Sequence, residues 1–140
     1  MNSNESNGKD YRSTLIEYWM EKSRESMETG RSEYEAGRFT PAVRSIYYAC
    51  FYALTAVLLE KGKSLKRHTA VRAALHRELI KTGLLNTSSG RFYDKIFDSR
   101  HKGDYQPMVE FESEQVKGYI DQAKGFIKEM EELLVKSIDS

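Results

Sequence analysis

The chain has 140 residues, with 22 lysines and arginines against 21 aspartates and glutamates, one cysteine and two prolines. That length suits a single domain with a real hydrophobic core. One cysteine excludes a disulfide framework, a cysteine-rich zinc site and an iron–sulfur cluster. A net charge of +1 excludes a uniformly basic nucleic-acid binder, although local patches stay open. We therefore expect a compact, cytoplasmic domain whose composition does not reveal a function.

The ends of the chain and its most apolar stretch set the domain boundaries. Residues 1–10 (MNSNESNGKD) are polar and have no apolar core, so they do not form a secretory signal. We expect a disordered tail there and a single domain over residues 11–138. The segment Ala42 to Leu59 is apolar but contains Arg44 and several hydroxyl groups. It predicts a buried central helix, and we expect no contact with membranes.

Helical spacing of apolar residues predicts two long helices in the first half of the chain. The first runs from about residue 11 to residue 36, and Gly37 ends it. Small residues near one face of this helix would let another helix approach closely; they are Ser23, Ser26 and Gly30. The second helix begins with Thr40 as its cap and Pro41 in its first turn, and it ends at Gly62. It is apolar on nearly all sides, so the other helices should surround it.

Three further helices are predicted in the second half. They cover about residues 68–82, ended by Gly83, and about residues 87–102, ended by Gly103. The last begins near Ser113 and carries an apolar stripe of 3.6-residue period. No segment shows the alternation of a strand. The fold class is therefore all-α, an up-and-down bundle of about five helices.

The near-neutral total charge hides an uneven distribution. Between Lys61 and Thr82 there are seven lysines and arginines against one glutamate, whereas residues 109–140 hold four lysines against eight acidic residues. A concentrated basic segment can bind phosphate groups even in a neutral protein. The candidate basic patch consists of Lys63, Lys66, Arg67 and Arg72. The alternative is a solvated surface that balances the acidic last helix.

The chain carries none of the common local catalytic motifs. The chain has no glycine-rich phosphate loop, no HExxH and no GxSxG. Its histidines, His68, His76 and His101, are too far apart for a local metal motif, so we expect no metal and no cofactor. His68 precedes the third helix and could cap it. Cys50 lies among apolar neighbours and is expected to be an inert core residue.

Charged and aromatic residues gather at the end of the fourth helix. Arg100 and Asp104 are four residues apart, as are His101 and Tyr105, so each pair can share a helix face if the helix continues past Gly103. An arginine beside an imidazole and a phenol could bind and cleave a phosphodiester. The alternative is an Arg100–Asp104 ion pair that orders the loop, with Tyr105 packed on the core.

The central helix carries polar groups that bear on the same site. Arg44, Tyr48 and Thr55 lie near one of its faces, with Ser45 and Tyr52 beside them. Polar groups on a central helix need partners. Arg44 should therefore meet an acidic residue or a ligand phosphate.

Four separated segments together resemble a known family. They are RSIYYACFYALTAVLLEKG, KRHTAV, KTGLLN and FDSRHKGDY, and the resemblance covers residues 11 to about 134. The chain is similar to the HEPN domain (higher eukaryotes and prokaryotes nucleotide-binding), closest to its stand-alone prokaryotic branch with an Arg-x-x-x-Asp-Tyr motif. The resemblance implies a four-helix core plus a short extra helix. It also implies a homodimer in which the arginine motifs of both subunits line a shared cleft.

The resemblance implies two kinds of function. Many members are metal-independent ribonucleases with an Arg-x(4–6)-His motif, and others pair with a minimal nucleotidyltransferase in a two-component, toxin–antitoxin-like module. Arg100 matches the family arginine, but the histidine is absent at the expected spacing, because His101 is adjacent and residues 105–107 are Tyr-Gln-Pro. Asp104 and Tyr105 match the branch without the histidine. This departure argues against ribonuclease activity and leaves nucleotide or RNA binding open.

Three hypotheses follow. In the first, the chain is a homodimeric binding module for a nucleotide, RNA or a nucleotidyltransferase partner, and its ligand-binding residues are Arg44, Tyr48, Arg100, Asp104 and Tyr105. In the second, it is a metal-independent endoribonuclease that uses Arg100 with His101 or Tyr105. In the third, it is a purely structural dimer. We favour the first, a protein that is not an enzyme.

Overall fold

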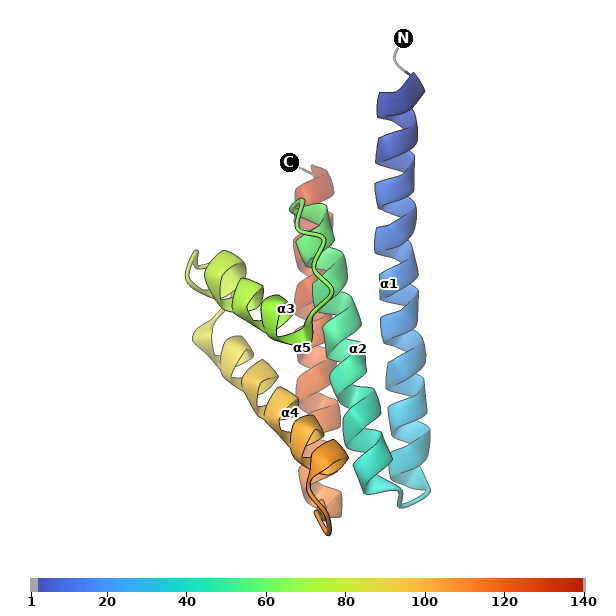
Figure 1. The fold of residues 1–140 in the computed structure, drawn as a ribbon, viewed down its shortest axis with the longest axis vertical. Helices are drawn as coiled ribbons and strands as arrows, with labels where there is room; N and C mark the ends of the chain where they lie inside the picture. Colours follow the sequence, from blue (N-terminus) through green and yellow to red (C-terminus); the bar gives the residue numbers. More distant parts are fainter. Residues whose placement is uncertain (1–2, 140) are drawn as a thin grey trace.

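The computed structural model describes residues 3–139. Within them the chain forms five α-helices and no strand: α1 (Ser3–Glu35), α2 (Phe39–Glu60), α3 (His68–Ala74), α4 (Thr87–Tyr105) and α5 (Ser113–Asp139). The helices run up and down in turn: α2 returns beside α1, α4 lies on the side away from α1, and α5 runs back alongside α2 (Figure 1). The predicted all-α bundle is thus confirmed. The structure includes residues 3–10 in α1, and the predicted domain boundary at residue 11 stays a prediction.

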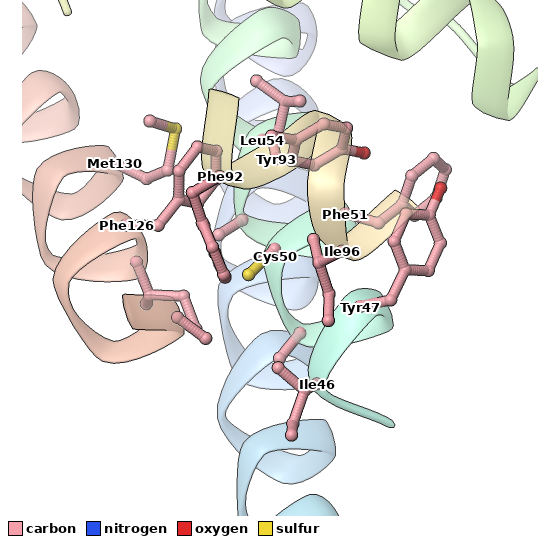
Figure 2. Packing of buried hydrophobic residues seen from close by; sticks show 14 of the residues in the cluster. Ile46, Tyr47, Cys50, Phe51, Leu54, Phe92, Tyr93, Ile96, Phe126 and Met130 are labelled. Atoms are coloured by element: carbon pink, nitrogen blue, oxygen red, sulfur yellow. The ribbon is translucent and has the colours of Figure 1, made fainter. Parts of the chain in front are cut away.

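Helix α2 is the centre of the bundle, because α1, α3, α4 and α5 all contact it. Twelve of its 22 residues are buried. In Figure 2, Leu54 of α2 lies beside Tyr93 of α4, and Phe126 of α5 lies beside Phe92 of α4, with ring centroids 6.3 Å apart. Among the described helices only α2 is long and apolar enough to cross a membrane, but 67% of its apolar window is buried. It is therefore the core helix that the sequence predicts.

Cys50 lies within this core. It is fully buried, and burial raises the pKa of its thiol well above the ordinary value. A thiol held protonated in an apolar environment is a poor nucleophile. The prediction that Cys50 is a core residue is confirmed.

Helices α1 and α2 form a closely packed hairpin. The Ser23 hydroxyl, fully buried, donates a hydrogen bond of 2.7 Å to the Ala49 carbonyl oxygen. A Cβ atom placed on Gly30 would lie only 3.2 Å from the Ile46 side chain. The small residues of α1 therefore allow the close approach that their spacing predicts.

Three of the four predicted glycine stops are confirmed. Gly37, Gly62 and Gly83 each follow a helix with a positive φ of 76–83°, which favours glycine at a helix C-terminus. The fourth is wrong, since α4 continues through Gly103 to Tyr105. The Thr40 cap is also wrong: α2 begins at Phe39 after Arg38, and no side chain caps it.

The third predicted helix has two parts. Helix α3 is followed without a break by a π-helical segment, η1 (Leu75–Ile80), so the helical stretch ends close to the predicted residue 82. Its N-terminal cap is Arg67, and no side chain makes a capping hydrogen bond. His68 is therefore not a cap, and its ring is used elsewhere.

Candidate functional site

Two arginines from different helices meet one carboxylate between α2 and α4. Arg100 Nε lies 2.8 Å from Asp104 Oδ2, and Arg44 Nε lies 3.7 Å from the same oxygen. The first contact is an ion pair whose atoms are not aligned as a hydrogen bond. The exposed fractions of the side chains are 14% for Arg100, 21% for Asp104 and 58% for Arg44. Two positive charges thus share one negative charge, and the cluster keeps a net positive charge.

This pairing depends on the extra length of α4. The i,i+4 spacing brings Arg100 and Asp104 onto one face only because the helix continues past Gly103. Gly103 is in contact range of Thr40 and Phe111, each 3.3 Å from an added Cβ. Its small size lets the end of α4 pack against the start of α2. Asp104 is thereby brought within reach of Arg44.

Aromatic rings surround the Arg100 guanidinium. Its central carbon lies 5.4 Å from the ring centroids of both Tyr47 and Tyr48, and Nη2 donates a hydrogen bond of 3.4 Å to the Tyr48 hydroxyl. Arg44 lies over the Tyr48 ring at 5.3 Å. Cations over aromatic faces are stabilised by the ring quadrupole, more so where water is excluded. The rings therefore hold Arg100 in place without neutralising its charge.

A histidine enters the same cluster from the N-terminus of α3. His68 stacks on Phe51 with centroids 4.3 Å apart, and its Nδ1 lies 2.7 Å from the Tyr47 hydroxyl. Burial raises the pKa of Tyr47 to about 12, so the hydroxyl stays protonated at neutral pH. Burial, and then the charge of Arg100, lower the pKa of His68. With the Tyr47 hydroxyl as donor, the neutral imidazole accepts at Nδ1 and carries its own proton on Nε2.

The structure separates the other predicted site residues from Arg100. His101 and Tyr105 are exposed, the latter by 67%, and their ring centroids lie 4.7 Å apart. The alternative of a purely structural ion pair predicted that Tyr105 packs on the core, and this is wrong because Tyr105 is exposed. Four of the six predicted residues, Arg44, Tyr48, Arg100 and Asp104, form one cluster, whereas His101 and Tyr105 form an exposed pair at the end of α4.

The predicted basic patch divides into two parts. Arg72 faces α4, where it pairs with Asp94 at 4.0 Å and Asp98 at 3.7 Å and lies 4.2 Å over the Phe97 ring. Lys63 is 3.9 Å from Glu78. Lys66 and Arg67 are exposed on the segment that leads into His68. Those two are the members of the patch that directly precede His68 in the chain.

Sequence reasoning did not place Tyr47 or His68 in the site. The His68 ring stacks on Tyr47 and Phe51, which lie one turn apart on α2. A tyrosine and a phenylalanine in an apolar helix do not by themselves indicate a binding site. Only the fold brings residue 68 back to them. In the described part of the chain, no three His, Cys, Asp or Glu side chains are grouped to hold a metal ion.

What this geometry can do is bind an anion. A positively charged, partly buried guanidinium fixed by aromatic rings suits phosphate, which accepts paired hydrogen bonds from arginine. The neutral His68 adds an N–H donor to the same region. Its imidazole is also a proton-transfer group near a positive charge.

The chain is similar to one known domain family and to several curated proteins. A family model described as HEPN domain matches residues 16–133. A Thermotoga maritima protein named UPF0332 protein is 43% identical over 120 residues, covering 86% of this chain and 91% of that protein. Two proteins of Methanocaldococcus jannaschii, each named "Putative toxin", are 27% identical. They are matched over 86% and 82% of this chain and over 82% and 90% of their own lengths.

Proposed function

The chain belongs to the HEPN domain family, and we propose that it is a toxin-like binding module that holds a phosphate group of a nucleotide or RNA at Arg100. The names of the two archaeal relatives support the toxin-like part of this proposal. The observation that carries the binding part is the Arg100 guanidinium. The Arg100 side chain is 14% exposed, and its guanidinium is set against two tyrosine rings and shares a single carboxylate with Arg44.

Replacing Arg100 tests the proposal directly. Arg100→Ala should weaken binding of a fluorescent RNA oligonucleotide, and of ATP, by about ten- to a hundredfold, because a charge-assisted hydrogen bond is lost. Arg100→Lys should lose less, since it keeps the charge but not the planar fork. Arg91→Ala is the matched control, an exposed arginine on the same helix. Unchanged affinity in Arg100→Ala, measured by fluorescence anisotropy, would refute the phosphate site.

The proposal includes partners, a second copy of the chain and a small nucleotidyltransferase. Both come from the resemblance of the Arg-x-x-x-Asp-Tyr segment and from family membership. Sedimentation equilibrium should give about twice the 16.2 kDa of one chain. A pull-down with a minimal nucleotidyltransferase encoded beside the gene should recover the complex. A monomer at micromolar concentration would remove the dimer from the proposal. We also propose a cytoplasmic location.

A second candidate function is metal-independent RNA cleavage. The observation that favours it is His68, a neutral imidazole that packs against Tyr47 as Arg100 does. Arg100 would stabilise the developing charge and the histidine would transfer a proton. Cleavage of labelled RNA in EDTA tests this. Loss of cleavage in His68→Ala would assign the role to His68, whereas loss in His101→Ala or Tyr105→Phe would assign it to the exposed pair. Absence of cleavage by the wild type would reject the enzyme.

A further inference from the structure

A row of aromatic side chains leads away from the Arg100 site across α2 and α1. Tyr48 and Tyr52, one turn apart on α2, have ring centroids 5.6 Å apart, and Trp19 of α1 stacks on Tyr52 at 5.6 Å with an angle of 21° between the planes. Tyr18 meets Trp19 edge to face at 5.0 Å. We call Tyr48, Tyr52 and Trp19 the aromatic row.

The row is partly accessible to solvent. All three side chains are half-buried, and the adjoining Tyr18 is 48% exposed. The Trp19–Tyr52 stack is offset, because a centroid distance of 5.6 Å exceeds the contact distance of about 3.5–4.0 Å between overlapping rings. Each ring is therefore covered only in part by its neighbour.

Positive charge borders the row at both ends. At one end Tyr48 contacts Arg100 and Arg44, the phosphate site itself. At the other end Lys22 Nζ lies 5.7 Å from the Tyr18 ring. Beside Tyr48 lies the His68 ring, 5.6 Å away, which directly follows Lys66 and Arg67 in the chain. Partly buried aromatic rings beside cations match the chemistry of a strand of nucleotides, in which π-faced bases alternate with phosphates.

We propose that the aromatic row is a stacking surface for the bases of single-stranded RNA, with one phosphate of that strand at Arg100. This inference rests on the proposed function and adds a substrate class to it, a single strand of at least two nucleotides. Stacking of this kind depends little on base identity, because every base has a π-face. A second copy of the chain lying on the row is the competing occupant.

The experiment compares two probes of equal length, a fluorescent oligo(A) and the same phosphodiester chain without bases. Trp19→Leu and Tyr52→Leu keep an apolar side chain but remove the ring, and each should weaken oligo(A) binding by about tenfold. Neither should change binding of the abasic chain, whereas Arg100→Ala should weaken both. Tyr34→Leu is the control, a partly buried tyrosine about 22 Å along α1 from Trp19.

The wild-type protein supplies a measurement that needs no substitution. Trp19 is the only tryptophan of the chain, so its fluorescence reports directly on the row. Oligo(A) should quench it and the abasic chain should not. This readout stands even if a leucine variant fails to fold, which thermal unfolding would reveal.

The outcomes separate the two proposals. If the leucine variants bind oligo(A) like the wild type while Arg100→Ala does not, the stacking surface is wrong and the phosphate site stands. If Arg100→Ala binds both probes normally while the leucine variants lose oligo(A), the phosphate site is wrong and the row stands. If a leucine variant becomes monomeric in sedimentation, the row holds a second copy and the inference is overturned. If the wild type binds neither probe, both proposals fail.

Discussion

Asp104 has two opposite effects on the Arg100 site: it positions the arginine and it competes with an anionic ligand. The carboxylate holds the guanidinium at 2.8 Å and so fixes its position. The same carboxylate forms an ion pair with the guanidinium, with which a bound phosphate would otherwise pair. Since Arg44 also approaches it, Asp104 occupies the region where two arginines could bind an anion together. Asp104 is thus both a support for Arg100 and its resident competitor.

Removing the negative charge of Asp104 should strengthen ligand binding. Asp104→Asn keeps the size and a carbonyl acceptor but no longer competes for Arg100. Ion pairs at sites with some solvent access contribute about 0.2–1 kcal/mol, so RNA affinity should rise by a factor between about 1.4 and 5. Fluorescence anisotropy at fixed salt measures this change. Asp98→Asn is the control, because it makes the same charge change on α4 but pairs with Arg72. Weaker binding in Asp104→Asn alone would mean that the carboxylate contributes to the ligand contact.

His68 should make stability depend on pH. Burial and the Arg100 charge lower its pKa in the folded state below the ordinary 6.5, so the unfolded chain binds the proton more readily. Stability is therefore unaffected by this group above about pH 6.5 and falls as the pH decreases through that value toward the folded pKa. Urea unfolding of the wild type from pH 7.5 to 5.5 should show this loss.

The difference between variants isolates the His68 contribution. His68→Gln should be less stable at pH 7.5, by about 1 kcal/mol, because the Tyr47 hydroxyl loses its acceptor. Its stability should then fall less than that of the wild type toward pH 5.5. His76→Gln serves as the control for a histidine outside the site. Parallel curves for His68→Gln and the wild type would contradict the assignment.

At the scale of elements, the end of α4 shows what sequence can and cannot predict. The i,i+4 spacing of Arg100 and Asp104 is visible in the sequence, but a glycine between them predicts a helix stop. Gly37, Gly62 and Gly83 obey that rule: each has a positive φ, which glycine adopts without steric cost, and nothing lies within 4 Å of an added Cβ. Gly103 instead lies against Thr40 and Phe111. Its glycine serves close packing, which only tertiary structure reveals.

The same limit explains His68. Helix α2 and its aromatic residues were predictable from periodicity, because burial repeats along a helix. The position of His68 depends on the path of residues 61–67, which carry no periodic signal. They connect α2 to α3 and bring residue 68 to Tyr47, 21 positions earlier in the chain. The sequence thus predicts the elements and four residues of the site, and the connection brings His68 to it.

Glycines within the helices should respond differently to the same substitution. Gly118 and Gly125 of α5 have open space around them, so alanine should raise the free energy of unfolding by about 0.5–1 kcal/mol at each. At Gly90 the new Cβ would lie 2.9 Å from His76 Cε1. The ring must then move and lose its 3.0 Å hydrogen bond to Asp94, so Gly90→Ala should be destabilising by about 1 kcal/mol. Urea unfolding of the three variants checks this. Stabilisation in all three variants would show that the His76 ring moves aside without lowering the free energy of unfolding.

For the whole molecule, charge is arranged by region and not by total. The net charge of +1 conceals a basic segment after α2 and an acidic α5. Long-range attraction of a nucleic acid by the protein as a whole should therefore be weak. Affinity must come from local contacts, namely Arg100 and Arg44 at the site and Lys66 and Arg67 beside it.

The salt dependence of RNA affinity measures how many of these cations contact phosphate groups. If four cations each neutralise one phosphate of a single strand, the logarithm of the affinity should fall with the logarithm of salt concentration with a slope of about −3. The double variant Lys66→Gln/Arg67→Gln should reduce the magnitude of that slope by about 1.4. Lys124→Gln/Lys128→Gln removes the same charge from the groove between α1 and α5 and should leave the slope unchanged. Equal slopes for both double variants would mean that total charge, and not the region around Arg100, determines binding.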